Sequence, residues 1–162
     1  MKQLIQFVLI SLVGAVVAGC ASTPAQFYTL NATAKADGAP SVICSVIINP
    51  VIVPEAVSQP QFVITTGPNS VEVEEFNRWD APLDDAIARV VSADLVTLMG
   101  TPRVSSAPIA DFGPVYQVTI RVERFESIRA EGTQNASALV DAIWTVSNPD
   151  GQTVGSGRTT AN

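Results

Sequence analysis

Cys20 is the residue of this sequence whose type and surroundings predict the most specific chemistry. It ends the small-residue stretch Val17-Ala18-Gly19-Cys20, which follows Lys2 and the uncharged apolar segment Leu4–Ala18. This order of basic, apolar and small-residue regions is typical of a bacterial lipoprotein signal peptide. The apolar segment has about 15 residues, fewer than the roughly 20 that a transmembrane helix needs. The pattern predicts that residues 1–19 are removed and that the Cys20 thiol carries a diacylglyceryl group; an uncleaved N-terminal anchor is the alternative.

The lipid on Cys20 is expected to attach the chain to a membrane. Acylation of the freed amine, with a group such as palmitate, adds a further chain, and two or more acyl chains anchor a protein stably. Ala21 follows the cysteine at the position where an aspartate would resemble a signal for retention in the inner membrane. We therefore expect a lipid-anchored protein of the outer membrane that faces the periplasm.

Composition argues against most classes of enzyme. The sequence has no histidine, which excludes Ser-His-Asp and Cys-His catalysis and removes the commonest zinc ligand. Cys44, the second of two cysteines, lies in an apolar run and is expected to be a buried hydrophobic residue. Without residues 1–19 the chain has 8 basic and 15 acidic residues, and this net charge of −7 disfavours nucleic acid as a partner. We expect no enzyme activity, no metal site and no cofactor, and any lipid contact besides the anchor should be apolar.

Four further residues are candidates for polar or interface roles. Asp94 falls within the apolar stripe of a predicted helix, so a structural tie to a loop backbone or to an arginine is expected. Phe76, Arg78 and Trp79 combine two aromatic rings with an arginine, a composition typical of an interface hot spot. The alternative for the two aromatic residues is that they close the core beneath the helix. Arg78 is then the better candidate for contact with a partner.

Hydrophobic periodicity predicts one amphipathic helix over residues 80–100. Asp80 is the expected N-cap, Gly100 ends the helix, and apolar residues up to Leu98 form the stripe that packs on the rest of the domain. Asp84 and Asp85 near its start suit the helix dipole, which explains this pair of carboxylates without a catalytic role.

The remaining segments predict a sheet. Residues 42–53 indicate a buried strand, and residues 61–66 and 71–76 indicate a hairpin. Residues 116–123 and 138–146 alternate apolar and polar side chains, as in a strand with one covered face, and this alternation places Trp144 in the core. The expected fold class is α+β, a small antiparallel sheet with one amphipathic helix packed on one face.

The expected organisation is a signal peptide at 1–19, a lipidated tether at 20–41 and one α+β domain at 42–162. The tether is rich in alanine, threonine and proline and shows little periodicity, with a short ordered piece expected at residues 27–30. The 143 residues that follow the signal peptide are enough for one domain with a substantial core.

Several segments, taken in order, resemble the ABC-type transport auxiliary lipoprotein family of the PqiC type. They are the Cys20 motif, Tyr28-Thr29-Leu30, the stretch Ile47–Pro54, the block Gln59–Asn69 that continues through Glu75–Trp79 into Pro82-Leu83, Arg124-Phe125-Glu126, and the pattern of Leu139, Ala142, Trp144 and Gly151. The resemblance covers almost the whole chain after residue 19. Family members often carry arginine where this chain has Gln59 and Thr66, and they usually continue into a C-terminal helix, whereas this sequence ends at Asn162.

The resemblance implies a non-catalytic lipoprotein of the outer membrane that docks or scaffolds an intermembrane lipid transport system. Its implied partners are an MCE-domain protein and an ABC transporter. Association with further copies of the same chain, as a homo-oligomer, is a second possibility. The alternative is an envelope lipoprotein that activates a cell-wall synthase or assists envelope assembly, because a small α+β scaffold alone does not separate these roles. An enzymatic role would depend on carboxylates alone and would need two of them facing each other.

Overall fold

A computed structural model describes residues 23–38, 41, 43–107, 113–129 and 136–162 of the chain. The predicted signal peptide and Cys20 lie outside the described residues. The described part contains a mixed eight-stranded sheet and one α-helix, α2 (Leu83–Met99), with the short 3-10 helix η1 (Glu55–Val57). The strands are β1 (Gln26–Tyr28), β2 (Ser45–Ile48), β3 (Gln61–Gly67), β4 (Ser70–Trp79), β5 (Val104–Ser105), β6 (Val115–Arg129), β7 (Ala136–Ser147) and β8 (Thr153–Ala161).

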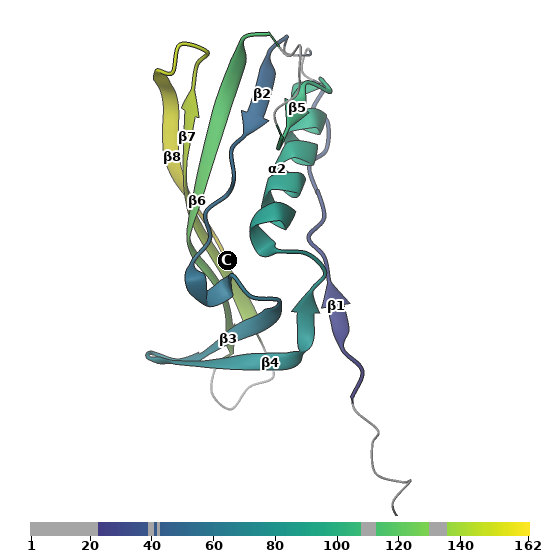
Figure 1. Ribbon diagram of the computed structural model, residues 1–162, viewed down its shortest axis with the longest axis vertical. Coiled ribbons are helices and arrows are strands. Elements are labelled where there is room, and N and C mark those ends of the chain that lie inside the picture. Colours follow the sequence, from purple (N-terminus) through teal and green to yellow (C-terminus); the bar gives the residue numbers. More distant parts are fainter. Residues whose placement is uncertain (1–22, 39–40, 42, 108–112, 130–135) are drawn as a thin grey trace, which may run out of the picture.

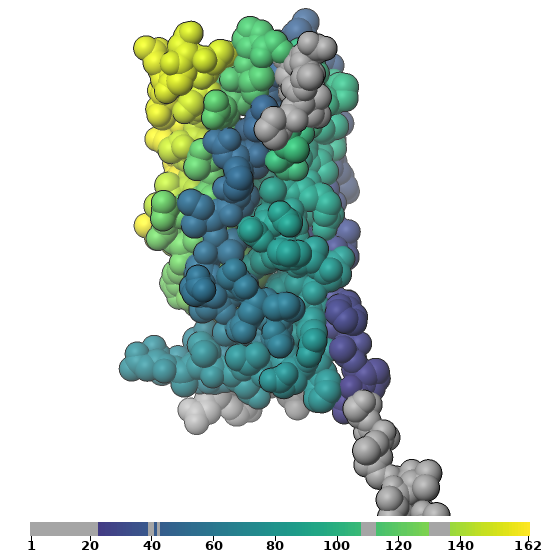
Figure 2. Space-filling model, in the orientation of Figure 1, coloured from purple at the N-terminus to yellow at the C-terminus, as the bar shows by residue number. Residues whose placement is uncertain are grey.

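The long strand β6 organises the sheet. On one side it pairs antiparallel with β7, which pairs with β8. On its other side, its first residues pair with β2 and its last residues with β3, and both pairings are parallel. The hairpin of β3 and β4 therefore lies across one end of the sheet, and α2 lies along one face (Figure 1). The tip of this hairpin projects sideways from the body of the molecule (Figure 2).

The α+β class agrees with the expectation, but the expected small antiparallel sheet is wrong. The β1–β4, β2–β5, β2–β6 and β3–β6 pairings are parallel, and the sheet has eight strands. Parallel pairing requires a long connection. The connection from β2 to β5 contains the hairpin and α2, so these neighbours are distant in sequence, and local alternation carries no information about which of them pair.

Helix α2 begins later than the sequence indicated. Its N-cap is Pro82, and the predicted N-cap Asp80 instead donates its backbone N–H to the Tyr28 carbonyl oxygen at 2.9 Å. A connection to β1 therefore takes precedence over local capping. Gly100 ends the helix in the left-handed conformation, with φ 62°, as predicted. Leu98, expected on the apolar stripe, is 47% exposed, whereas the next residue, Met99, packs against the core.

The core lies where α2 packs against β2, β5 and β6. Its buried members are Val46, Ile48, Val51, Ala88, Val104, Ile120 and Val122. Trp144, placed in the core by the sequence pattern, is half-buried and packs against this cluster, as does the free thiol side chain of Cys44. The central part of the domain is thus held by hydrophobic contact between one helix and the middle of the sheet.

Candidate functional site

Residues 26–34, which we call the N-terminal strap, lie against the folded domain. Strand β1 pairs with the end of β4, from Gln26 opposite Asn77 to Tyr28 opposite Trp79. These residues fall in the range that the sequence indicated as a tether. The segment nearest to the predicted lipid attachment is therefore an edge strand of the sheet.

Two charged residues of α2 hold the rest of the strap. Arg89 donates from Nη2 to the Leu30 carbonyl oxygen at 3.0 Å, and Asp94 Oδ1 accepts the backbone N–H groups of Thr33 at 2.9 Å and Ala34 at 2.8 Å. Hydrogen bonds to a charged group are stronger than those between neutral groups. The half-buried carboxylate of Asp94 thus faces a loop backbone, and the strap is fastened along more than one turn of α2.

Four aromatic rings connect the strap with three other strands. The ring centroids of Tyr28 and Phe62 are 4.8 Å apart, those of Phe62 and Trp79 are 4.4 Å apart, and those of Trp79 and Phe125 are 5.8 Å apart. Such offset and edge-on pairs stabilise beyond the area they bury. This aromatic stack joins β1, β3, β4 and β6 at the end of the sheet that carries the hairpin.

The structure separates the three residues predicted as a partner-binding set. Trp79 belongs to the aromatic stack, whereas Phe76 is 46% exposed. Asn77 lies on the same side of β4 as the aromatic stack. Its Oδ1 accepts a hydrogen bond from Tyr28 Oη at 3.3 Å, and its Nδ2 donates to Glu74 Oε2 at 3.3 Å. Phe76 and Arg78, its neighbours along the strand, therefore face the opposite side. Of the predicted set, Phe76 is exposed, Arg78 is half-buried on the same side of the strand, and Trp79 lies in the stack.

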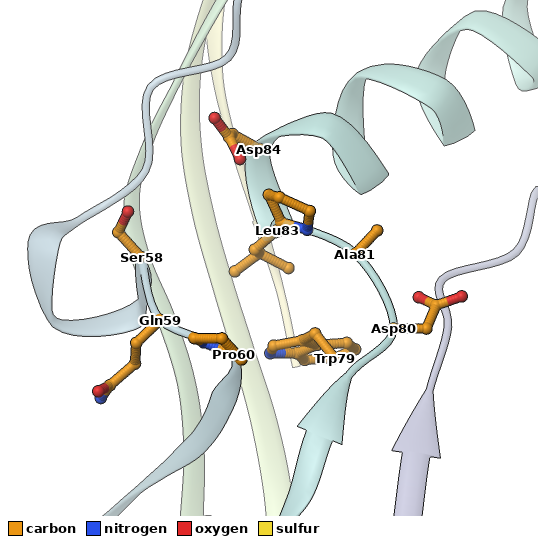
Figure 3. A pocket seen from close by; sticks show the side chains of 9 residues that line it. Ser58, Gln59, Pro60, Trp79, Asp80, Ala81, Leu83 and Asp84 are labelled. Atoms are coloured by element: carbon orange, nitrogen blue, oxygen red, sulfur yellow. The ribbon is translucent and has the colours of Figure 1, made fainter.

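A small pocket lies where β4 leads into α2. Its volume is about 210 Å³, and Figure 3 shows Trp79, Pro60 and Leu83 around it. The carboxylates of Asp80 and Asp84 lie on opposite sides of the pocket and do not face each other (Figure 3). Ligand sites usually measure 300 Å³ or more, and glycosidase-type catalysis needs two facing carboxylates. The pocket therefore has the character of a packing defect at a strand–helix junction.

A larger concavity is an apolar hollow of about 430 Å³ between α2 and the sheet. It is lined by Ile87, Val91 and Leu95 of α2, Val118, Ile120, Val122 and Phe125 of β6, and Val140, Ala142, Trp144 and Val146 of β7. Such a lining can hold alkyl groups or apolar side chains, and its side chains offer no charge for catalysis. Each of these residues has the sequence pattern of a core residue, so sequence reasoning missed the hollow.

Asp141 forms a polar network that sequence reasoning also missed. Its side chain is buried, and Arg158 donates from Nε to Oδ1 at 2.8 Å and from Nη2 to Oδ2. These hydrogen bonds lower the pKa of Asp141, against the effect of burial, which alone would raise it. The network ties the edge strand β8 to β7. The signal in the sequence was the position of an acid and a base on strands joined by the tight turn at 148–151.

Among the described residues, no group of three or more acidic or cysteine side chains is placed to hold a metal ion. Glu72 and Glu74 instead pair with Arg129 at 3.6 and 3.0 Å. The one α-helix within the described ranges is too short and too polar to cross a membrane.

Comparison with known proteins identifies the family. The model of the ABC-type transport auxiliary lipoprotein components matches residues 28–162. The fold is similar to the crystal structure of a Xanthomonas campestris protein of the DUF330 family, with a TM-score of 0.69 and 18% identity over 84% of this chain and 76% of that one. It is also similar to an uncharacterized protein, with a TM-score of 0.61 and 16% identity over 86% and 81% of the two chains. No curated protein matches the sequence. The match of the family model over most of the chain confirms the resemblance of the sequence motifs, and the chain belongs to the family of ABC-type transport auxiliary lipoprotein components.

Proposed function

We propose that this protein is an outer-membrane lipoprotein subunit of an intermembrane lipid transport system, with an MCE-domain protein and an ABC transporter as its partners. The observation that carries the proposal is the family match over residues 28–162, which begins eight residues after the lipid-attachment motif at Cys20. A transport auxiliary component with a lipid anchor is a docking or scaffold subunit, and the transporter supplies the energy.

The surfaces of the domain support a binding role. The apolar hollow offers hydrophobic contact, and the buried carboxylate of Asp141 is neutralised by Arg158. Glu74 is likewise paired with Arg129. The pKa of the Asp141 carboxyl is lowered by the hydrogen bonds from Arg158, so this group is poorly suited to act as a general acid.

Arg78 is the residue that we propose for contact with the partner protein. It lies at the end of β4 on the side opposite the aromatic stack, and its Nε donates to the Glu75 carbonyl oxygen at 3.0 Å. This hydrogen bond orients the guanidinium, and an oriented arginine beside aromatic residues is common at binding hot spots.

The test is copurification from detergent-solubilised membranes of cells that express the tagged full chain. We expect the MCE-domain protein and the ABC transporter to copurify with the wild type. Cys20→Ser should remain unprocessed and lose both partners, because the domain is no longer delivered to the outer membrane. Recovery of a cell-wall synthase in place of the MCE-domain protein would contradict the proposal and favour the alternative role.

Two matched variants test the contact residue. Arg78→Glu should keep the wild-type melting temperature and lose at least tenfold in recovered partner, since truncating a hot-spot side chain costs about 2 kcal/mol or more. Arg121→Glu is the control, because the Arg121 side chain is 60% exposed and its ion pair with Glu123 is long, at 4.0 Å. Equal recovery of the partner by both variants would exclude Arg78 as a contact.

A further inference from the structure

We propose that the domain lies against the surface of the membrane that holds its anchor, through an apolar face at the hairpin end of the molecule. The inference rests on the lipid attachment at Cys20 that is part of the proposed function. Four exposed side chains of β1 and β4 form this surface, which we call the hairpin face: Phe27, Val71, Val73 and Phe76.

The exposure of these four side chains is large for apolar residues. Phe27 is 66% exposed, Val71 61%, Phe76 46% and Val73 40%. Scattered single hydrophobic residues are normal on protein surfaces, but grouped ones mark sites of interaction with proteins or membranes. The group needs an explanation in terms of what it contacts.

Strand register places the four residues on one side of their strands. Phe62 opposes Glu74, and Ile64 opposes Glu72, and these positions face the aromatic stack and the core. Val71 and Val73 alternate with them and face outward. Phe27 precedes Tyr28 of the stack, and Phe76 precedes the inward-facing Asn77, so both also face away from the stack.

Two of the three acidic side chains of β4 are kept away from this side; the third, Glu75, follows Val73 by two residues on the outer side and is exposed. Glu72 and Glu74 lie on the opposite side of the strand, where Arg129 pairs with both. Alternation thus gives β4 one side with ion-paired carboxylates and one side that is apolar apart from Glu75 and Arg78. The apolar side is the one that can approach a lipid surface with a single carboxylate, that of the exposed Glu75, and the transfer of carboxylates into a low-dielectric region is costly.

The length of chain between the anchor and the hairpin face limits how far this face can be from the membrane. Cys20 and Phe27 are seven residues apart, which is at most about 25 Å of extended chain. The strap from Gln26 onward is fixed to β4 and α2, so only the chain before Gln26 can span the distance between the membrane and the domain. Residues 23–25 leave the domain at the same end as the crosswise hairpin (Figure 1).

A lipid surface is therefore the occupant that this geometry favours. The anchor brings the membrane close to the hairpin face in every molecule, so lipid reaches this face whether or not the partner protein contacts Arg78, which lies beside Phe27 at the β1 end of the face. The charge of −7 without residues 1–19 excludes attraction to anionic lipids as the main cause, so the contact is apolar and insensitive to salt.

The test places a fluorescent probe that is sensitive to polarity on the hairpin face. The lipidated full chain carries Cys44→Ala, which leaves the introduced cysteine as the free thiol, and is reconstituted in phosphatidylcholine–phosphatidylethanolamine vesicles. The labelled variants are Val71→Cys and, as the matched control, Val154→Cys. Val154 is 58% exposed and lies in β8 at the other end of the sheet.

We expect probe emission at residue 71 to shift to shorter wavelength and to gain intensity several-fold on vesicles, at low and high salt, with no change at residue 154. Phe27→Asp, which alters an exposed side chain, should abolish the shift without changing the melting temperature. An unchanged spectrum at residue 71 in protein that floats with the vesicles would overturn the inference while leaving the lipid anchor intact. A shift at residue 71 that appears only when the MCE-domain protein is added would also overturn it and would assign the face to a protein. Failure of the chain to float would instead refute lipid attachment, and with it both this inference and the proposed function.

Discussion

Gly157 is the position where a single methyl group should test the packing of β8 most sharply. It lies opposite Trp144, and a Cβ built on it would be 2.7 Å from Trp144 Cζ2 and 2.9 Å from Cε2. Gly155, two residues earlier on the same face, is the matched control, because its Cβ would be 3.8 Å from Trp144 Cζ3. Neither glycine has a positive φ, so alanine fits the backbone at both positions.

The expected changes in the free energy of unfolding have opposite signs. Gly155→Ala should stabilise by about 0.5 kcal/mol, because alanine loses less backbone entropy on folding than glycine. Gly157→Ala gains the same term but forces the indole ring away, which costs about 1–3 kcal/mol as overpacking. Movement of the ring also strains the hydrogen bond from Trp144 Nε1 to Thr159 Oγ1, 3.3 Å long. The apolar hollow beside Trp144 gives the ring room to move, so we take the lower part of this range.

The two variants should therefore differ by about 1–1.5 kcal/mol, or about 2–6 °C in melting temperature for a domain of this size. Thermal unfolding followed by circular dichroism measures this difference, and tryptophan fluorescence reports whether the indole has moved. Gly157→Ala should shift the emission and Gly155→Ala should leave it unchanged. If both substitutions raised the melting temperature equally, Trp144 would not lie over Gly157, and the assignment of this sheet face would be wrong.

Two further predictions concern the charged ties. Asp94→Ala removes the acceptor of the backbone N–H groups of Thr33 and Ala34, so amide hydrogen exchange at these two residues should become at least tenfold faster, while exchange in the middle of α2 stays unchanged. Unchanged protection of Thr33 and Ala34 would mean that the strap is held without Asp94. The hydrogen bonds from Arg158 lower the pKa of Asp141 below its unfolded value of about 3.9, so the stability they give is present above about pH 4 and is lost as the pH falls through the lowered pKa. The melting temperature of Asp141→Asn should therefore be lower than that of the wild type by a constant amount above pH 4, and this difference should become smaller in more acidic solution. A difference in melting temperature that is independent of pH would contradict a role for the charge of Asp141.

Local patterns identified the elements well. The helix ends at Gly100, and the hairpin turns at Pro68 and Asn69, because glycine tolerates the left-handed conformation and proline fixes its own φ angle. The alternation along β6 and β7 was visible because one side of these strands faces α2 and the other is polar. The start of the helix was misplaced, since the backbone of Asp80 bonds to Tyr28, which is 52 residues away in sequence.

Pairing between distant strands was beyond the sequence pattern. Alternation indicates that a segment is a strand, but a parallel neighbour is chosen by how the whole chain packs, so β2 beside β5 and β6 was not foreseen. The same limit applied to the partner-binding set. Phe76 and Trp79 look equivalent in sequence, yet β4 continues past the expected strand end at residue 76 to Trp79, so alternation turns one outward and the other into the aromatic stack.

Residue types at short range were enough to identify the lipid-attachment motif, the family, the lack of histidine chemistry, the hairpin and the C-terminal end of the helix. Tertiary structure alone decided that the strap is fastened to α2, that Asp141 is paired across two strands, and that a hollow separates the helix from β7. These features depend on contacts between segments far apart in the chain, where the geometry of the complete fold determines which groups meet.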